Sequence, residues 1–265
     1  MEAPFAGDRP YVLLSCAMSI DGYIDDASAE RLRLSNEADF DRVDAVRATC
    51  DAILVGAATI RRDDPRLLVR SQRRREARVG RGLPPSPLKV TVSGGGDLDP
   101  AAQFFTAGDV EKIVYSATGA LGKARERLGD AASVVDAGEP LSFPRALADL
   151  AARGVGRLMV EGGGGIHTAF LTAGLADELQ LVVAPFFVGD AAAPRFVADG
   201  AFPWTPRRPA RLVEVRQLED VVLLRYALSD RYGASDRHAP SGNHAPPNSD
   251  APPDSDAPCD HSAGG

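Results

Sequence analysis

The feature that most restricts the fold is a run of four glycines between an apolar segment and a helical pattern. The segment reads LMVEGGGG, from Leu158 to Gly165. Glycines at a strand-to-helix turn let backbone N–H groups approach an anion closely, and the helix N-terminus adds a favourable dipole. The turn therefore favours a bound diphosphate; the alternative is a tight turn that only needs positive φ angles.

The turn fits the dinucleotide-binding fingerprint of Rossmann folds only in part. Gly163 and Gly165 match, but the third glycine position holds Thr168. The acids that follow, Asp177 and Glu178, come about ten residues too early for the expected ribose contact. We therefore predict a phosphate-binding turn of another kind.

Glu161 precedes the glycines, at the expected carboxyl end of a central strand. A carboxylate beside a phosphate-binding turn can hold a polar substrate group or tune a proton. The alternative is that it caps the amides of the glycine turn.

Short β-rich runs alternate with helical patterns along residues 8–228, which predicts one α/β domain with a largely parallel central sheet and ligands at the carboxyl ends of its strands. The last two strands are expected to form an antiparallel hairpin. The predicted strands are Tyr11–Cys16, Ala52–Val55, Leu88–Val92, Lys112–Tyr115, Ser133–Val135, Arg157–Val160, Glu178–Ala184, Arg211–Arg216 and Val221–Ala227. The predicted helices are Ser35–Thr49, Ala57–Arg62, Ala120–Leu128, Phe143–Arg153 and Ile166–Ala173.

The first predicted helix has apolar residues at three-residue steps, so its polar residues Asp39, Asp41, Arg42 and Asp44 are expected to face solvent. Ser35 and Ser142 lie where N-caps belong.

Residues 229–265 contain no Leu, Ile, Val or Phe, and we predict a disordered tail because such a segment cannot bury enough apolar surface to offset its ordering entropy. The tail holds Cys259 and three of the four histidines (His238, His244 and His261). A metal site there is not expected, because scattered ligands on a flexible chain carry a large ordering cost.

Composition excludes several classes of protein. The net charge of −7 argues against general nucleic-acid binding, and no apolar run is long enough to cross a membrane. Residues 1–10 lack the apolar stretch of a signal peptide, and three widely spaced cysteines support neither a disulfide framework nor a zinc site. A cytoplasmic protein is expected.

A second motif, GAATIRRDDPRLLVR, covers Gly56–Arg70. It overlaps an arginine-rich stretch, residues 61–81, with nine arginines against three acids. Arginine suits bidentate phosphate recognition, so Arg70 is a candidate ligand. Most of the others, notably Arg73–Arg75 in an expected loop, are predicted to be solvated.

A third motif, AMSIDG at residues 17–22, completes a pattern that resembles the reductase domain of bacterial riboflavin biosynthesis, with the Gly56–Arg70 motif and the segment from Val160 to Leu179. The resemblance spans residues 10–228. It implies a dihydrofolate-reductase-like fold and the NADPH-dependent reduction of 5-amino-6-(5-phosphoribosylamino)uracil to its ribitylamino phosphate. Hydride would pass from nicotinamide C4 to ribose C1′ in its ring-opened form. Family members are generally dimers, so a homodimer is expected.

The resemblance also implies site residues. The positions that match substrate contacts are Arg47, Leu67, Arg70 and Glu161. The positions that match cofactor contacts are Ala17, Thr59, Asp63, Ser93, Gly162, Gly163, Gly164, Gly165 and Ile166. No metal site is implied, and no side chain is identified as the catalytic proton donor.

The chain departs from the bifunctional family pattern at two places. Ser15 stands where a lysine is usual, and Arg31-Leu32-Arg33 stands where serine–x–tryptophan is usual. The alternatives to the pyrimidine reductase are therefore a reductase of the same fold that acts on another heterocycle, such as a dihydropterin, and an NADPH-binding module without catalysis.

Overall fold

The computed structural model describes residues 9–28, 30 and 32–233, and the elements below lie within them. The strands are β1 (Tyr11–Ser19), β2 (Ala52–Gly56), β3 (Leu88–Ser93), β4 (Lys112–Ser116), β5 (Ser133–Asp136), β6 (Arg157–Val160), β7 (Glu178–Ala184), β8 (Arg211–Leu218) and β9 (Val221–Ala227). The α-helices are α1 (Glu37–Arg47), α2 (Ala57–Asp63), α3 (Gln72–Val79), α4 (Gln103–Thr106), α5 (Leu121–Leu128), α6 (Phe143–Ala152) and α7 (Gly164–Thr172).

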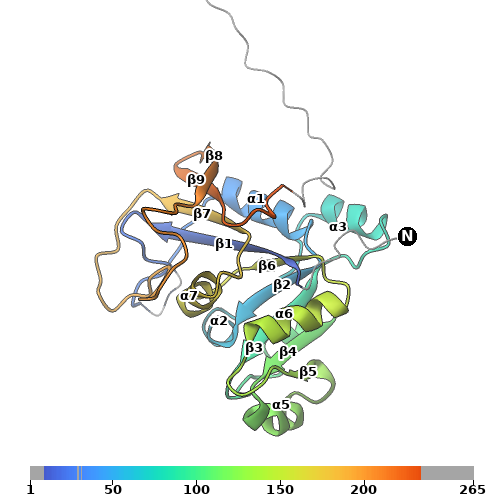
Figure 1. The fold of residues 1–265 in the computed structure, drawn as a ribbon. Coiled ribbons are helices and arrows are strands. Elements are labelled where there is room, and N and C mark those ends of the chain that lie inside the picture. Colours follow the sequence, from blue (N-terminus) through green and yellow to red (C-terminus); the bar gives the residue numbers. More distant parts are fainter. Residues whose placement is uncertain (1–8, 29, 31, 234–265) are drawn as a thin grey trace, which may run out of the picture.

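All the strands join one twisted sheet in the order β5-β4-β3-β2-β6-β1-β7-β9-β8 (Figure 1). Strands β1–β7 pair in parallel, and β9 pairs antiparallel with both β7 and β8. The central strands read as continuous apolar runs because a parallel sheet is covered on both faces. The predicted α/β fold, with its mostly parallel sheet and terminal antiparallel hairpin, is confirmed.

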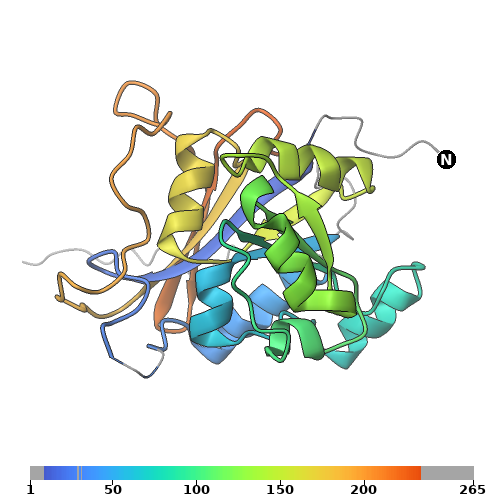
Figure 2. The same ribbon diagram turned by 90° about the horizontal axis from the view of Figure 1, so that it is seen from below.

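Helices cover both faces of the sheet (Figure 2). On one face, Phe170 of α7 packs in a buried cluster with Leu14 of β1. On the other face, Ile60 of α2 and Leu128 of α5 join a second cluster with Leu13 of β1. Successive residues of one strand thus serve opposite cores, as strand geometry requires.

The predicted loop around Arg73–Arg75 is wrong, because these residues belong to helix α3. Ser71 caps the helix by accepting the backbone N–H of Arg74. Arg78 is buried on its inner side and donates to the backbone carbonyl of Cys50 at 2.8 Å. Carbonyl acceptors and the long arginine stems stabilise a helix that has little apolar surface.

The expected exposure of Asp39 and Asp44 on α1 is also wrong, because both are buried. Asp44 accepts the backbone N–H groups of Arg70 and Ser71, at 2.5 and 3.1 Å. The N-cap of α1 is Asn36, next to the predicted Ser35. A carboxylate that accepts backbone N–H groups from a distant segment cannot be recognised by helical periodicity.

Asp177 binds residues from both ends of the described chain. Its fully buried carboxylate accepts the backbone N–H of Val12 at 2.9 Å and two hydrogen bonds from Arg9. Ser229 and Arg231 also donate to it, at 2.6 and 3.1 Å. The division into a body (8–228) and a tail (229–265) stays a prediction, and residues 234–265 lie outside the described part.

No helix in the described part of the chain is long and apolar enough to cross a membrane.

Truncation tests the contacts at Asp177. A chain that ends at residue 228 should lose about 2 kcal/mol of unfolding free energy relative to one that ends at residue 233, because Asp177 loses two hydrogen-bond donors. Urea unfolding measures the difference. Equal midpoints would show that these contacts do not contribute.

His167 on α7 provides a second test. It is buried, and its ring lies 5.3 Å from that of Phe196. Burial lowers its pKa from 6.5 to about 4. At pH values between 4 and 6.5 this histidine is protonated in the unfolded state but neutral in the folded state. The free energy of unfolding therefore falls as the pH drops from 6.5 towards 4.

The expected contribution at pH 4.5 is a loss of about 2–3 kcal/mol relative to pH 7. His167→Leu should show a correspondingly smaller loss in urea unfolding. An identical loss in the variant would exclude His167 as the cause.

Candidate functional site

Three adjacent parallel strands, β3, β2 and β6, end in turns at the same edge of the sheet. Strand β2 runs directly into α2, β3 into the loop Ser93–Asp97, and β6 into Glu161 and the glycine turn. The glycine turn lies close to the neighbouring strand: a Cβ atom on Gly56 would lie 2.8 Å from Cγ1 of Ile166. The end of β2 and the start of α7 are thus closely packed against one another.

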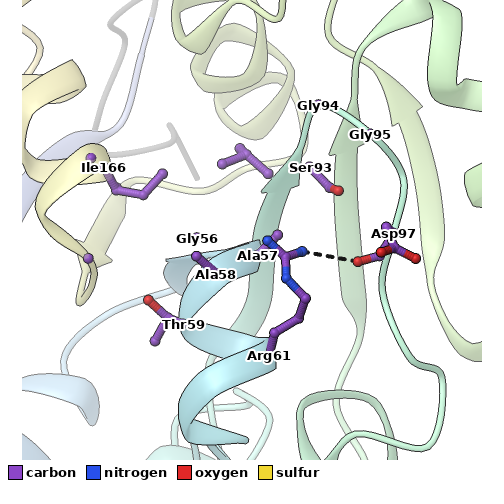
Figure 3. Close-up of a pocket in the computed structure, with 13 residues that line it drawn as sticks. Gly56, Ala57, Ala58, Thr59, Arg61, Ser93, Gly94, Gly95, Asp97 and Ile166 are labelled. Carbon is purple, nitrogen blue, oxygen red and sulfur yellow. Dashed lines mark hydrogen bonds between the residues drawn. The ribbon is translucent and has the colours of Figure 1, made fainter. Parts of the chain in front are cut away.

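These turns line a pocket of about 520 Å³ (Figure 3). The pocket contains five of the predicted cofactor residues, namely Thr59, Ser93, Gly163, Gly165 and Ile166. Its remaining lining residues are Gly56, Ala57, Ala58, Arg61, Val92, Gly94, Gly95 and Asp97. The structure therefore brings together residues from motifs far apart in the sequence.

The glycines of the turn have different surroundings. Gly163 has a φ of +75°, which favours glycine, and precedes the first residue of α7. A Cβ atom on Gly164 would clash with the backbone carbonyl of Arg195, whereas one on Gly165 would have nothing within 4 Å. Gly164 therefore serves the packing of the 185–205 segment, and Gly165 faces the pocket.

The start of α7 suits an anionic group. The N–H groups of Ile166 and His167 both donate to the carbonyl of Gly163, so those of Gly164 and Gly165 precede the helical hydrogen bonds. The positive end of the helix dipole adds to these donors. An exposed glycine wall next to a pocket of this size fits the diphosphate of a dinucleotide cofactor.

Beside the turn, Glu161 forms a two-point ion pair with Arg47 of α1. Nε and Nη2 of Arg47 donate to the two carboxylate oxygens at 2.6 and 2.5 Å. Burial opposes the charged form of Arg47, but the Glu161 carboxylate outweighs burial and raises the arginine pKa. Sequence periodicity would leave Arg47 on the helix surface, whereas its side chain is less than one-fifth exposed.

The other two predicted substrate residues follow α2. Leu67 is buried and has a φ of +49°, which is unusual for a leucine. Arg70 is exposed, and its guanidinium lies 5.7 Å from the centre of the Phe40 ring. The Asp44 contact to the backbone of Arg70 fixes this segment along α1, so that Arg70 presents its charge to solvent.

Four predicted cofactor residues do not line the pocket. Gly162 lies behind it, where a Cβ atom would be 3.2 Å from Oγ1 of Thr59, and Gly164 packs as described above. Asp63 is the half-buried last residue of α2. Ala17 is on β1, packed beside Val182. Their roles as cofactor contacts stay predictions.

Sequence reasoning missed the second glycine run, Gly94–Gly96, after β3. The same argument that identified the first run, glycines directly after a buried strand, applies to it. Arg61 and Asp97, which flank the pocket with this loop, were also missed.

The departures from the family pattern lie at the carboxyl side of the sheet. Ser15 is buried on β1, paired in register with Gln180 of β7. Arg33 is exposed, lies 5.2 Å from the centre of the Phe40 ring and pairs with Glu37. Arg31 is outside the described residues.

Metal ligands do not gather in the described part of the chain: no group of three His, Cys, Asp or Glu side chains there is arranged to hold an ion. The tail residues His238, His244, Cys259 and His261 lie outside it.

Comparison with known proteins decides the family. The profile of the RibD C-terminal domain matches residues 10–224. The chain belongs to the RibD C-terminal domain family. A relative from Archaeoglobus fulgidus, named 2,5-diamino-6-ribosylamino-4(3H)-pyrimidinone 5′-phosphate reductase, is 38% identical over 192 residues, which cover 72% of this chain and 87% of the relative.

Other members of the family extend this result. A Methanothermobacter thermautotrophicus protein with the same name is 36% identical over 72% of this chain and 85% of its own length. The riboflavin biosynthesis protein RibD of Bacillus amyloliquefaciens is 30% identical over 73% of this chain and half of its own.

Among solved structures, a pyrimidine reductase-like protein from Corynebacterium diphtheriae shares the fold, with a TM-score of 0.69 at 21% identity over 82% of this chain and 91% of its own.

Two glycine variants separate ligand contact from packing. Gly165→Val should weaken NADPH binding at least tenfold with little change in melting temperature, because its side chain fills the pocket and meets no protein atom. Gly164→Val should lower both the NADPH affinity and the melting temperature, because its side chain displaces the segment around Arg195. Calorimetric titration and thermal unfolding measure the two effects. Unchanged NADPH affinity in Gly165→Val would remove the glycine turn from the cofactor site.

Proposed function

We propose that the chain is an NADPH-dependent reductase of riboflavin biosynthesis, which converts the ribosylamino group of a phosphorylated pyrimidine into a ribitylamino group. Family membership supports the reaction type. The observation that carries the proposal is the Arg47–Glu161 pair directly beside the glycine-lined pocket. In this proposal, one edge of the sheet binds the dinucleotide and, next to it, the polar substrate.

A nicotinamide cofactor supplies a hydride when it is bound. The backbone N–H groups of Gly164 and Gly165, which precede the helical hydrogen bonds of α7, would donate to its diphosphate. Of these two glycines only Gly165 lines the pocket, together with Thr59 and Ser93. Ile166 closes one wall against Gly56, which excludes water from that side.

The substrate would lie on the α1 side of the glycine turn. Arg47 holds the Glu161 carboxylate in one orientation, which would let Glu161 accept a hydrogen bond from a hydroxyl or ring N–H group of the substrate. Arg70 would bind the 5′-phosphate. Reduction of the ring-opened imine adds hydride at C1′ and a proton at nitrogen, and we propose water as the proton source.

The group at C2 of the pyrimidine ring, an amino or an oxo group, is a finer question. The family resemblance implies 5-amino-6-(5-phosphoribosylamino)uracil, whereas the relatives at 36–38% identity are named for the 2,5-diamino-4(3H)-pyrimidinone form. Because Ser15 stands in place of the usual lysine, both pyrimidine phosphates should be tested as substrates. We also propose a homodimer, as the family resemblance implies, and a cytoplasmic location, as the composition predicts.

The first experiment follows the loss of nicotinamide absorbance with each of the two pyrimidine phosphates and with dihydrofolate. Oxidation of NADPH with a pyrimidine phosphate alone would support the proposal. Turnover of dihydrofolate alone would favour a reductase of another heterocycle. Tight NADPH binding without any turnover would contradict catalysis.

Arg70→Ala tests the phosphate contact. We expect the KM for the pyrimidine phosphate to rise by about 30- to 160-fold, corresponding to roughly 2–3 kcal/mol for a lost charge-assisted contact, with NADPH affinity unchanged. Arg73→Ala, on the exposed side of α3, is the matched control and should behave as the wild type. An unchanged KM in Arg70→Ala would remove this residue from the substrate site.

A further inference from the structure

The pocket has a polar end that the proposed reaction leaves unexplained. On the side of the glycine turn away from the Arg47–Glu161 pair, the pocket continues to Arg61 of α2 and to the loop Ser93–Asp97 after β3 (Figure 3). The sheet order is β3-β2-β6-β1, so this end lies across β2 from Glu161. If the nicotinamide ring points to Glu161, the adenosine half of the cofactor occupies this end.

Two side chains of opposite charge line this end. Arg61 is exposed and is the one cationic side chain among the residues that line the pocket in the described part of the chain. One of its N–H groups donates to the backbone carbonyl of Asp97 at 3.1 Å. A guanidinium has five N–H groups, so this bond holds the side chain at the pocket and leaves donors for a ligand.

The Asp97 carboxylate opposes a second negative charge. A carboxylate near the adenosine ribose accepts a hydrogen bond from a 2′-hydroxyl group, as in NAD sites, whereas an arginine accommodates a 2′-phosphate. Here Arg127 of α5 draws the carboxylate away: its Nη1 lies 3.2 Å from Oδ1 of Asp97, and its Nε donates to the carbonyl of Leu98 at 2.7 Å.

We propose that Arg61 binds the 2′-phosphate of NADPH and that Arg127, by pairing with Asp97, prevents this carboxylate from repelling the phosphate. Arg61 is then the residue that selects NADPH over NADH, and Arg127 is a positioning residue that acts through Asp97. The assignment rests on the proposed function, because it takes the pocket as the nicotinamide cofactor site.

Binding measurements on the full chain test the assignment of Arg61. Calorimetric titration of Arg61→Ala should show a Kd for NADPH raised ten- to a hundredfold and a Kd for NADH within twofold of the wild type. Arg61→Lys should keep part of the preference because it keeps the charge. Arg66→Ala is the control, since Arg66 is exposed, contacts Gln103 and does not line the pocket.

A double-mutant cycle tests Arg127. Because an exposed ion pair is weak, Arg127→Ala should lower the NADPH-to-NADH affinity ratio only about two- to fivefold. The same change in an Asp97→Asn background should leave the ratio unaltered, since no carboxylate is then set free. An equal effect in both backgrounds would show that Arg127 acts by another route.

The outcomes separate this assignment from the proposed function. The assignment of Arg61 is overturned, while the cofactor site stands, if the wild type binds NADPH and Arg61→Ala has the same effect on the affinities for NADPH and NADH. The same holds if Arg61→Ala changes neither affinity. If the wild type binds neither cofactor, the proposed function falls and the assignment falls with it.

Discussion

The close approach of helix α7 to the end of strand β2 is the constraint on which the site depends. Gly56 and Ile166 are so near that a single Cβ atom on Gly56 would lie 2.8 Å from the isoleucine side chain. This contact fixes the start of α7 beside the N-terminal turn of α2, and the pocket opens between them. The pocket is thus formed by adjacent parallel strands that end at one edge, with glycines where side chains would close the gap.

Charge divides this edge of the sheet into two parts. On the α1 side, Arg47 and Glu161 neutralise each other in a geometry that leaves a carboxylate fixed in place. On the β3 side, Arg61 and Asp97 face the same pocket, with Arg127 beside the carboxylate. A dinucleotide that spans both parts would place its reactive end by Glu161 and its adenosine end by Arg61.

Sequence reasoning predicted the sheet well because buried parallel strands are continuous apolar runs. It also identified the glycine turn and Glu161 from local pattern alone, while Arg47 came from resemblance to the family. It failed at α3 and at Asp44, because the contacts that stabilise them join segments more than twenty residues apart. The glycine run after β3 could have been found by the same pattern, and it would have indicated the end of the pocket that Arg61 lines.

The most direct test of the account is a crystal structure of the protein with NADP⁺ and ribose 5-phosphate. We expect the diphosphate on the amides of Gly164 and Gly165, the nicotinamide ring next to Glu161 and the ribose phosphate at Arg70. A cofactor bound outside the pocket, or a sugar phosphate remote from Arg70 and Glu161, would contradict the central claim that this edge of the sheet brings a dinucleotide and a sugar phosphate together.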